Sequence, residues 1–251
     1  MCPRPVVTSA AVFYDGRVLR AVLFDFNGVL VDNVDVHSHL LAQVLNEEGL
    51  PSEAAGGSSL RARSDREVLA AILEGAGKGS EPAAVNRLVA RKAGYYQAHV
   101  RQHGYTFYPG ALELVESAAD QGLMLGIVCG ALREEIVQAL HQSGLRRYFK
   151  ALVSAEDVRR GKPHPEIYQR ALEELNNQPP LPERLLHPHE VLAVESSPMG
   201  LTAATGAGLV CLGVAHRFEL CQLATASAAV HSLAEINPGR LQGLFAEASQ
   251  R

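Results

Sequence analysis

The sequence has no marked excess of charge of either sign. Its 23 lysine and arginine residues and 27 aspartate and glutamate residues give a net charge of −4, and the two signs are mixed along the chain. A nucleic-acid-binding chain would carry a basic stripe, and a chain that recruits a basic partner would carry an acidic tail. Neither is present, so we expect no nucleic-acid partner.

Long apolar runs are also missing. No window is apolar enough to span a bilayer, and residues 1–16 lack the apolar core of a secretory signal. The cysteines form neither a CxxC pair nor a zinc-type spacing; they are Cys2, Cys129, Cys211 and Cys221. We therefore expect reduced thiols in a cytoplasmic protein that has no membrane contact.

The 251 residues contain no repeat and no low-complexity tract, and 47% are apolar, which suffices for a full core and a small second domain. Short β-branched runs alternate with amphipathic helical patterns, as in an α/β fold with a Rossmann-like parallel sheet wrapped by helices. The predicted strands are residues 18–24, 123–128, 151–153, 191–194 and 209–213. The predicted helices around them are residues 111–121, 132–143, 166–175 and 198–207.

Between the first and second predicted strands the pattern becomes helical only. Apolar stripes containing Leu40, Leu69 and Leu88 predict three successive helices. Such an insertion predicts a separate helical cap domain at residues 35–104, and an α/β core domain formed by residues 1–34 and 105–251. In open α/β sheets ligands bind at the carboxyl edge of the strands, so we expect the cap to cover that edge.

The first predicted strand ends in a polar turn, Asp25-Phe26-Asn27-Gly28-Val29-Leu30-Val31-Asp32. A carboxylate directly after a buried strand is costly unless it binds something. Gly28 allows a tight backbone turn beside it. By itself the string is equally compatible with an ordinary Asp–Asn–Gly turn.

Four ordered motifs resemble the haloacid dehalogenase superfamily, in its phosphoglycolate phosphatase and β-phosphoglucomutase branch. The turn at Asp25 resembles the first motif, DxDGTLxD, and the segment ending in Cys129-Gly130 occupies the second. Residues 161–168, GKPHPEIY, match the third motif, GKPxPxxY. Residues 194–201, VESSPMGL, are similar to the fourth, xEDSxxG. The resemblance covers residues 18–216 and implies a phosphate-transferring hydrolase.

The resemblance also implies roles for individual residues. Asp25 would be the nucleophile that forms a phospho-aspartate, which splits one difficult transfer into two steps. Lys162 would supply the cation that phosphoryl transfer needs, with Cys129 and Gly130 holding another phosphate oxygen. Mg²⁺ would be bound by oxygen atoms of four residues, Asp25, Asn27 (through its backbone carbonyl), Glu195 and Ser196.

Asn27 departs from the family pattern at the catalytic position of the general acid/base aspartate. An amide has no useful pKa, so it neither protonates a leaving alkoxide nor activates water. Loss of general acid/base help typically costs about 10²–10⁴-fold in rate. The backbone carbonyl of Asn27 is unaffected by the change and remains a possible magnesium ligand.

Cys129 and Ser196 are two further departures. A thiol at position 129 replaces a serine or threonine and is a weak donor, so we expect backbone N–H groups to contact the phosphate. A buried, inert thiol is the favoured interpretation, because no histidine adjoins Cys129 in the sequence. Ser196 replaces the main magnesium carboxylate, which leaves Glu195 and predicts weak metal binding.

Arg61 and Arg63 lie in a Gly/Ser-rich segment that leads into a predicted helix of the cap. Two arginines there would suit a second anionic group on a substrate, although a solvated surface position explains them equally well. We expect the ligand to be a small phosphorylated metabolite. The sequence does not indicate an oligomeric state.

Two functions remain open from the sequence. One is a Mg²⁺-dependent phosphatase that is slow, or narrow in its substrates, because Asn27 replaces the acid. The other is a catalytically impaired protein that uses the same pocket to bind a phosphorylated ligand or a protein partner. The changes at residues 27, 129 and 196 favour the second, whereas Asp25, Lys162 and Glu195 favour the first.

Overall fold

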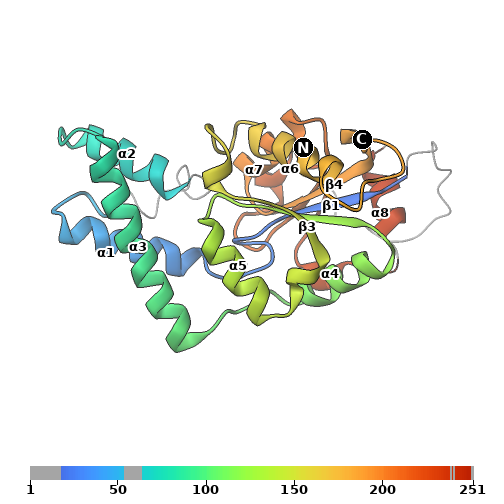
Figure 1. Ribbon diagram of the computed structural model, residues 1–251, viewed down its shortest axis with the longest axis horizontal. Helices are drawn as coiled ribbons and strands as arrows, with labels where there is room; N and C mark the ends of the chain where they lie inside the picture. The colour runs from blue at the N-terminus through green and yellow to red at the C-terminus, as the bar shows by residue number, and fades with distance from the viewer. Residues whose placement is uncertain (1–17, 54–63, 238, 240, 250–251) are drawn as a thin grey trace. The chain divides into compact units, whose positions relative to one another are not determined.

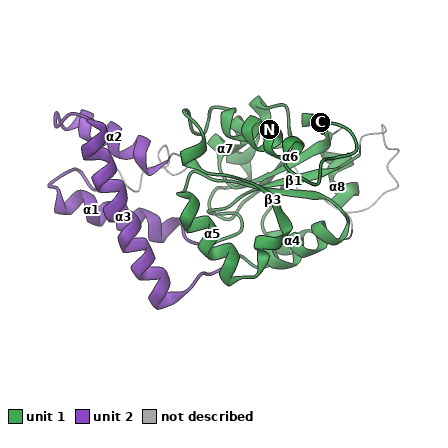
Figure 2. Cartoon of the chain, in the orientation of Figure 1, with its two compact units in different colours: residues 1–31, 107–251 green, residues 32–106 purple. Residues whose placement is uncertain are grey.

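The computed structural model describes residues 18–53, 64–237, 239 and 241–249 (Figure 1). The chain separates into two compact units, and the boundaries fall between Val31 and Asp32 and between Thr106 and Phe107 (Figure 2). Residues 32–106 are called the helical unit below, and the described residues on either side of them are called the core unit. No helix in the described part of the chain has the length and hydropathy needed to cross a membrane.

The core unit contains a parallel sheet with the strand order β3-β2-β1-β4-β5-β6. Its strands are β1 (Ala21–Asp25), β2 (Met124–Val128), β3 (Phe149–Val153), β4 (Val191–Glu195), β5 (Val210–Val214) and β6 (Ala228–Val230). Every pair of neighbouring strands is parallel. The prediction of an α/β fold with a Rossmann-like sheet is therefore confirmed.

Helices cover both faces of this sheet, with α6 and α7 on one side and α4 and α5 on the other in Figure 1. The helices of the core unit are α4 (Ala111–Asp120), α5 (Arg133–Gln142), α6 (Glu166–Asn177), α7 (Pro198–Gly206) and α8 (Leu241–Ser249). Short 3₁₀ turns are η2 (Leu145–Tyr148), η3 (Ala155–Asp157), η4 (Pro188–Glu190), η5 (Leu220–Leu223) and η6 (Leu233–Glu235). Because both faces are covered, β1, β4 and β5 are buried along their whole length.

The predicted elements agree with the structure except near their ends. The first strand begins at Ala21 rather than at residue 18, because Val18 lies outside the ladder and is 54% exposed. Its last residue is Asp25, so the carboxylate belongs to the strand end itself. Strand β6 was not predicted, because Ala228-Ala229-Val230 is short and rich in alanine, a residue that is depleted in strands.

The described part of the helical unit has α1 (Val34–Glu47), α2 (Asp65–Gly75) and α3 (Pro82–His103). These match the helices expected from the apolar stripes, whose leucines at 40, 69 and 88 are buried. Helix α2 begins with a capping box in which the Ser64 hydroxyl accepts from the Glu67 N–H and the Glu67 carboxylate accepts from the Ser64 N–H. This cap satisfies two of the N–H groups that the first helical turn leaves without partners.

Candidate active site

Three side chains of the candidate site lie at the carboxyl ends of neighbouring strands of the core unit. Asp25 ends β1, Glu195 ends β4, and Cys129 follows β2. Strand β1 lies between β2 and β4, where the order of the strands reverses. In open α/β sheets this switch point is the usual place for a ligand.

A buried lysine joins the two carboxylates at this edge. The Lys162 Nζ lies 2.9 Å from Asp25 Oδ1 and 2.6 Å from Glu195 Oε1. All three residues are buried, with Lys162 4% exposed and Glu195 0% exposed. Lys162 is therefore not a solvated loop residue, and the chain places the ammonium group directly beside the candidate nucleophile.

The charges of this cluster do not balance within the chain. Burial, together with the charge of Glu195, raises the pKa of Asp25 to about 7 against the opposing effect of Lys162. Burial alone would lower the pKa of Lys162, but the Asp25 and Glu195 carboxylates outweigh it and hold the pKa above its usual value. Above pH 7, where Asp25 is ionised, one ammonium between two carboxylates leaves one excess negative charge, which a bound cation would neutralise.

Replacing this lysine by an uncharged residue is expected to destabilise the protein. The variant Lys162→Met keeps a similar volume but leaves two buried carboxylates without a counter-charge, which should cost about 3–5 kcal/mol of unfolding free energy at pH 8. Without Lys162 the pKa of Asp25 rises above about 7, so the variant loses stability as the pH rises through 7 and regains it at lower pH. Urea unfolding at several pH values measures both effects.

Lys150 offers a matched control for that substitution. Its Nζ contacts the Pro180 carbonyl at 2.6 Å, away from any carboxylate of the cluster. We expect Lys150→Met to change stability by less than about 1 kcal/mol with little pH dependence. Adding Glu195→Gln to Lys162→Met should recover part of the loss, and a pH-independent loss in Lys162→Met would contradict the interpretation.

Cys129 lies at the expected place after β2, but as a neutral thiol. Burial and the nearby Asp25 charge raise the pKa of Cys129 to about 12, so the thiolate needed for nucleophilic attack does not form near neutral pH. The Cys129 N–H donates to the Val153 carbonyl, and the Ala131 N–H donates to the Cys129 Sγ at 3.4 Å. These two amides are used within the chain, which leaves Gly130 between them as the remaining candidate for a phosphate contact in this segment.

The turn that carries Asn27 is closed by backbone hydrogen bonds. The Phe26 carbonyl accepts from the N–H groups of Leu30 and Val31, and the Val31 carbonyl accepts from the Gly28 N–H. Gly28 has a φ of 84°, which is accessible to glycine and unfavourable for other residues. The tight turn therefore follows from the glycine that the sequence places there.

His216 also contacts this turn, and no motif in the sequence pointed to it. Its Nδ1 lies 3.0 Å from the Gly28 carbonyl, so Nδ1 carries the proton and donates. Its ring stacks on Tyr108 with the centroids 3.8 Å apart. Because His216 is separated from Gly28 by 188 positions, only the folded chain shows this contact.

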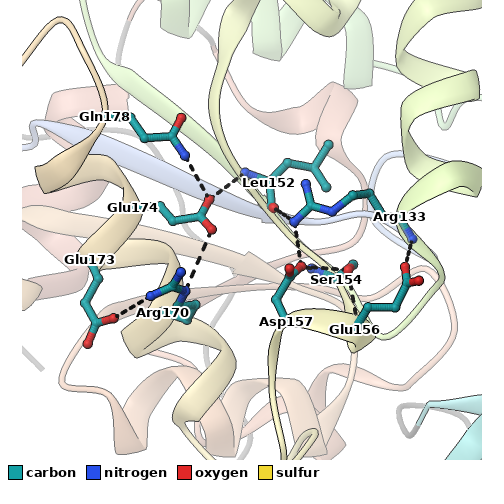
Figure 3. A network of polar contacts seen from close by, with 9 residues as sticks. All are labelled: Arg133, Leu152, Ser154, Glu156, Asp157, Arg170, Glu173, Glu174 and Gln178. Atoms are coloured by element: carbon teal, nitrogen blue, oxygen red, sulfur yellow. Dashed lines mark hydrogen bonds and ion pairs between the residues drawn. The ribbon is translucent and has the colours of Figure 1, made fainter.

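A polar network joins the segments that follow β2 and β3 (Figure 3). The Arg133 guanidinium, at the start of α5, bonds the Leu152 carbonyl at 2.9 Å and the Asp157 carboxylate at 2.7 Å. The same carboxylate oxygen accepts from the Ser154 N–H and hydroxyl, each at 2.7 Å. The segment after β2 is thereby tied to the segment after β3, which runs on to Lys162.

The remaining predicted site residues contribute less. Ser196 is buried, and its backbone N–H donates to Glu195 Oε2 at 3.1 Å. Arg61 and Arg63 lie outside the described residues.

In the helical unit, Lys92 is almost fully buried, and its Nζ lies 2.5 Å from Asp65 Oδ2 and 2.7 Å from His37 Nδ1. The Lys92 charge is thus already compensated by Asp65 within that unit.

The residues at the sheet edge fit magnesium as a site with few protein ligands. Among the described residues, no group of three or more His, Cys, Asp or Glu side chains is arranged to hold a metal ion. Mg²⁺ commonly uses only one or two carboxylates and completes its shell with water and substrate phosphate. The buried Asp25 carboxylate and the excess negative charge of the cluster are compatible with a site of this kind.

Comparison with known proteins gives consistent matches along the chain. A family model described as haloacid dehalogenase-like hydrolase matches residues 22–214. Validoxylamine A 7'-phosphate phosphatase from Streptomyces hygroscopicus subsp. limoneus is 28% identical, over 86% of this chain and 95% of that protein. Phosphoglycolate phosphatase from Yersinia pestis is 26% identical, over 81% and 84%.

Solved structures share the fold. CbbY from Rhodobacter sphaeroides, in complex with phosphate, aligns with a TM-score of 0.73 at 23% identity, over 88% of this chain and 97% of that chain. A β-phosphoglucomutase from Clostridium difficile aligns with a TM-score of 0.78 at 21% identity, over 93% and 100%. These matches confirm the resemblance carried by the four motifs. The chain belongs to the haloacid dehalogenase-like hydrolase family, in the branch that contains CbbY and phosphoglycolate phosphatase.

Proposed function

We propose that this protein is a Mg²⁺-dependent phosphatase that hydrolyses a small phosphorylated metabolite through an aspartyl-phosphate on Asp25. Two relatives are named phosphatases of small phosphorylated molecules, which supports the reaction class. The observation that carries the proposal is the buried cluster in which Lys162 Nζ contacts Asp25 Oδ1 at 2.9 Å. A carboxylate beside a fixed ammonium group supplies an attacking nucleophile and a positive charge for the phosphoryl oxygens.

Asp25 performs the first step. A carboxylate oxygen of Asp25 attacks phosphorus, the bond from phosphorus to the ester oxygen breaks, and the leaving group departs with the bonding electrons. Lys162 remains charged because its pKa is raised, so its ammonium group stabilises the negative charge on the phosphoryl oxygens. A magnesium ion held by the Asp25 carboxylate and the Asn27 carbonyl would neutralise further charge on the phosphate.

Water completes the reaction in the second step. It attacks the phosphorus of the aspartyl-phosphate, releases inorganic phosphate and regenerates the Asp25 carboxylate. The helical unit is proposed to act as a cap that shuts bulk water out during the first step. The Cys129 thiol is a poor candidate for the base that activates this water, because its pKa is about 12 and the thiolate does not form near neutral pH.

The missing acid determines which substrates the site favours. Asn27 donates no proton, so an alkoxide leaving group would depart without help. An acyl phosphate or another activated ester releases a stable anion and needs no such help. We therefore propose that the preferred substrates have leaving groups of low pKa.

A second candidate is a protein that binds a phosphorylated ligand without turning it over. The amide at Asn27 and the inert thiol at Cys129 favour it, since both replace groups that act on the substrate in the family pattern. The two candidates use the same residues at the sheet edge and differ only in turnover, so one experiment separates them.

The experiment incubates the purified protein with Mg²⁺ and matched pairs of acyl and alkyl phosphates. We expect phosphate release with Mg²⁺, none after chelation by EDTA, and rates at least about 10²-fold higher for the acyl phosphates. Rapid acid quenching followed by mass spectrometry should find the phosphoryl group on the peptide that contains Asp25. Binding of the esters without any release would support the second candidate instead.

A further inference from the structure

Tyr168 is the largest fully buried side chain of the described core, yet the mechanism above gives it no role. It lies in α6, and its hydroxyl donates a hydrogen bond of 2.6 Å to Glu195 Oε1. The phenol therefore meets the same carboxylate that holds Lys162. A phenylalanine would fill the space of the ring equally well, so packing alone does not account for the hydroxyl.

The Glu195 carboxylate is held on every side by groups of the core unit. Its Oε1 accepts from Tyr168 and Lys162, each at 2.6 Å. Its Oε2 accepts from the Ser196 N–H at 3.1 Å and from the Ser197 hydroxyl at 3.5 Å. Such a set of donors fixes the position of a buried carboxylate.

Gly200 provides the room that this arrangement requires. A Cβ atom at position 200 would lie 2.1 Å from the carboxyl carbon and from both carboxylate oxygens of Glu195. Any side chain at position 200, in the first turn of α7, would therefore push the Glu195 carboxylate away from Lys162. The inward orientation of Glu195 thus depends on a missing side chain on one side and on a phenol on the other.

The phenol remains a donor under all ordinary conditions. Burial, and then the charge of Glu195, raises the pKa of Tyr168 well above 10, so the hydroxyl keeps its proton. Tyr168 also lies close to Lys162 itself, with Nζ 5.7 Å from the centroid of the ring, which is within the range of a cation–π contact. The hydroxyl of Tyr168 thus acts on the Lys162 ammonium group through Glu195, and the ring lies close to that group directly.

We propose that Tyr168 is a positioning residue: its hydroxyl orients the Glu195 carboxylate so that Glu195 holds the Lys162 ammonium group against Asp25, ready for a phosphoryl group. Gly200 makes that orientation possible. The proposal rests on the proposed function for its consequence, which is phosphate binding, and on the described contacts for its geometry. It assigns Glu195 the role of anchoring the lysine.

The test is Tyr168→Phe, which removes the hydroxyl and keeps the ring. With one donor to a buried charged acceptor lost, we expect KM and the Kd for inorganic phosphate, measured by calorimetry with Mg²⁺ present, to rise about tenfold. The matched control is Tyr148→Phe, which removes a hydroxyl that contacts only the neighbouring Arg147, at 2.8 Å, among the described hydrogen bonds. Equal affinities in Tyr168→Phe and the parent would overturn the proposal.

A double-mutant cycle distinguishes action through Glu195 from a general packing effect. In a Glu195→Gln background the charged acceptor is gone, so Tyr168→Phe should change phosphate affinity much less than it does in the parent. The same fold-change in both backgrounds would show that Tyr168 acts independently of Glu195, and the proposal would fail. Neither outcome depends on turnover.

A final measurement keeps this proposal separate from the proposed function. In protein labelled with ¹⁵N-lysine, the Nζ resonance of Lys162, assigned by its absence in Lys162→Met, should move in Tyr168→Phe and not in Tyr148→Phe. An unmoved resonance would refute the positioning role even in an active enzyme. A parent chain that neither binds nor releases phosphate would refute the proposed function, and the resonance would still report on Tyr168.

Discussion

The variant Asp25→Asn is expected to release no measurable phosphate from any substrate that the parent protein hydrolyses. An amide does not attack phosphorus, so the covalent route is closed, and we expect a loss of at least about 10⁴-fold in kcat. The same variant should bind inorganic phosphate, because Lys162 remains in place. Phosphate release and calorimetric binding, measured side by side, check the two halves of this expectation.

The melting temperature of Asp25→Asn shows whether a loss of activity could come from unfolding. The pKa of Asp25 in the folded chain is about 7, above its ordinary value of 3.8, so without metal the parent loses stability as the pH rises through 7. Asparagine carries no charge, and we expect the variant to melt about 2–4 °C above the parent at pH 8 in EDTA. The exposed Asp120→Asn should match the parent in both activity and melting temperature. Phosphate release by Asp25→Asn at the parent's rate would exclude Asp25 as the nucleophile.

The variant Asn27→Asp is expected to raise kcat for alkyl phosphates by about 10²–10⁴-fold. A carboxyl group at position 27 would protonate the leaving oxygen in the first step and take a proton from water in the second. Acyl phosphates should gain much less, because their leaving groups need no proton. The ratio of the two gains, from steady-state rates on matched substrates, is the informative quantity.

A matched charge change elsewhere controls for the added negative charge of Asn27→Asp. Asn86 is exposed on α3, and Asn86→Asp should leave both rates unchanged. If Asn27→Asp accelerates acyl and alkyl phosphates equally, the added group is not acting as an acid on the leaving oxygen. If neither rate changes, another group already moves the proton, and Asn27 does not limit the reaction.

The strands and helices of the core could be predicted from the sequence because each depends on a local pattern. The runs at β1, β2, β4 and β5 are apolar without alternation, which is typical of strands covered on both faces. The amphipathic stripes of α4, α5 and α6 have the helical period. Where the local signal was weak, as in the alanine-rich β6, the prediction failed.

The candidate site was predictable to the extent that motifs fall at strand ends. Asp25 and Glu195 end parallel strands, which meet at one edge of a sheet, and Lys162 follows a glycine in a recognisable segment. Contacts between distant segments gave no such signal. The stacking of Tyr108 on His216 and the bond from His216 to the Gly28 carbonyl appear only in the folded chain.

The family, the order of the elements and the groups that could react can be read from residue types and their spacing, and these groups include the amide at Asn27 and the thiol at Cys129. The charges of those groups and their contacts depend on how the chain folds. Burial raises the pKa of Asp25 to about 7 and that of Cys129 to about 12. In the folded chain Glu195 contacts Tyr168 and Lys162 and fills the space beside Gly200. The reason is that solvation and Coulomb energies depend on distances through the folded protein, which residue types and spacing along the chain do not contain.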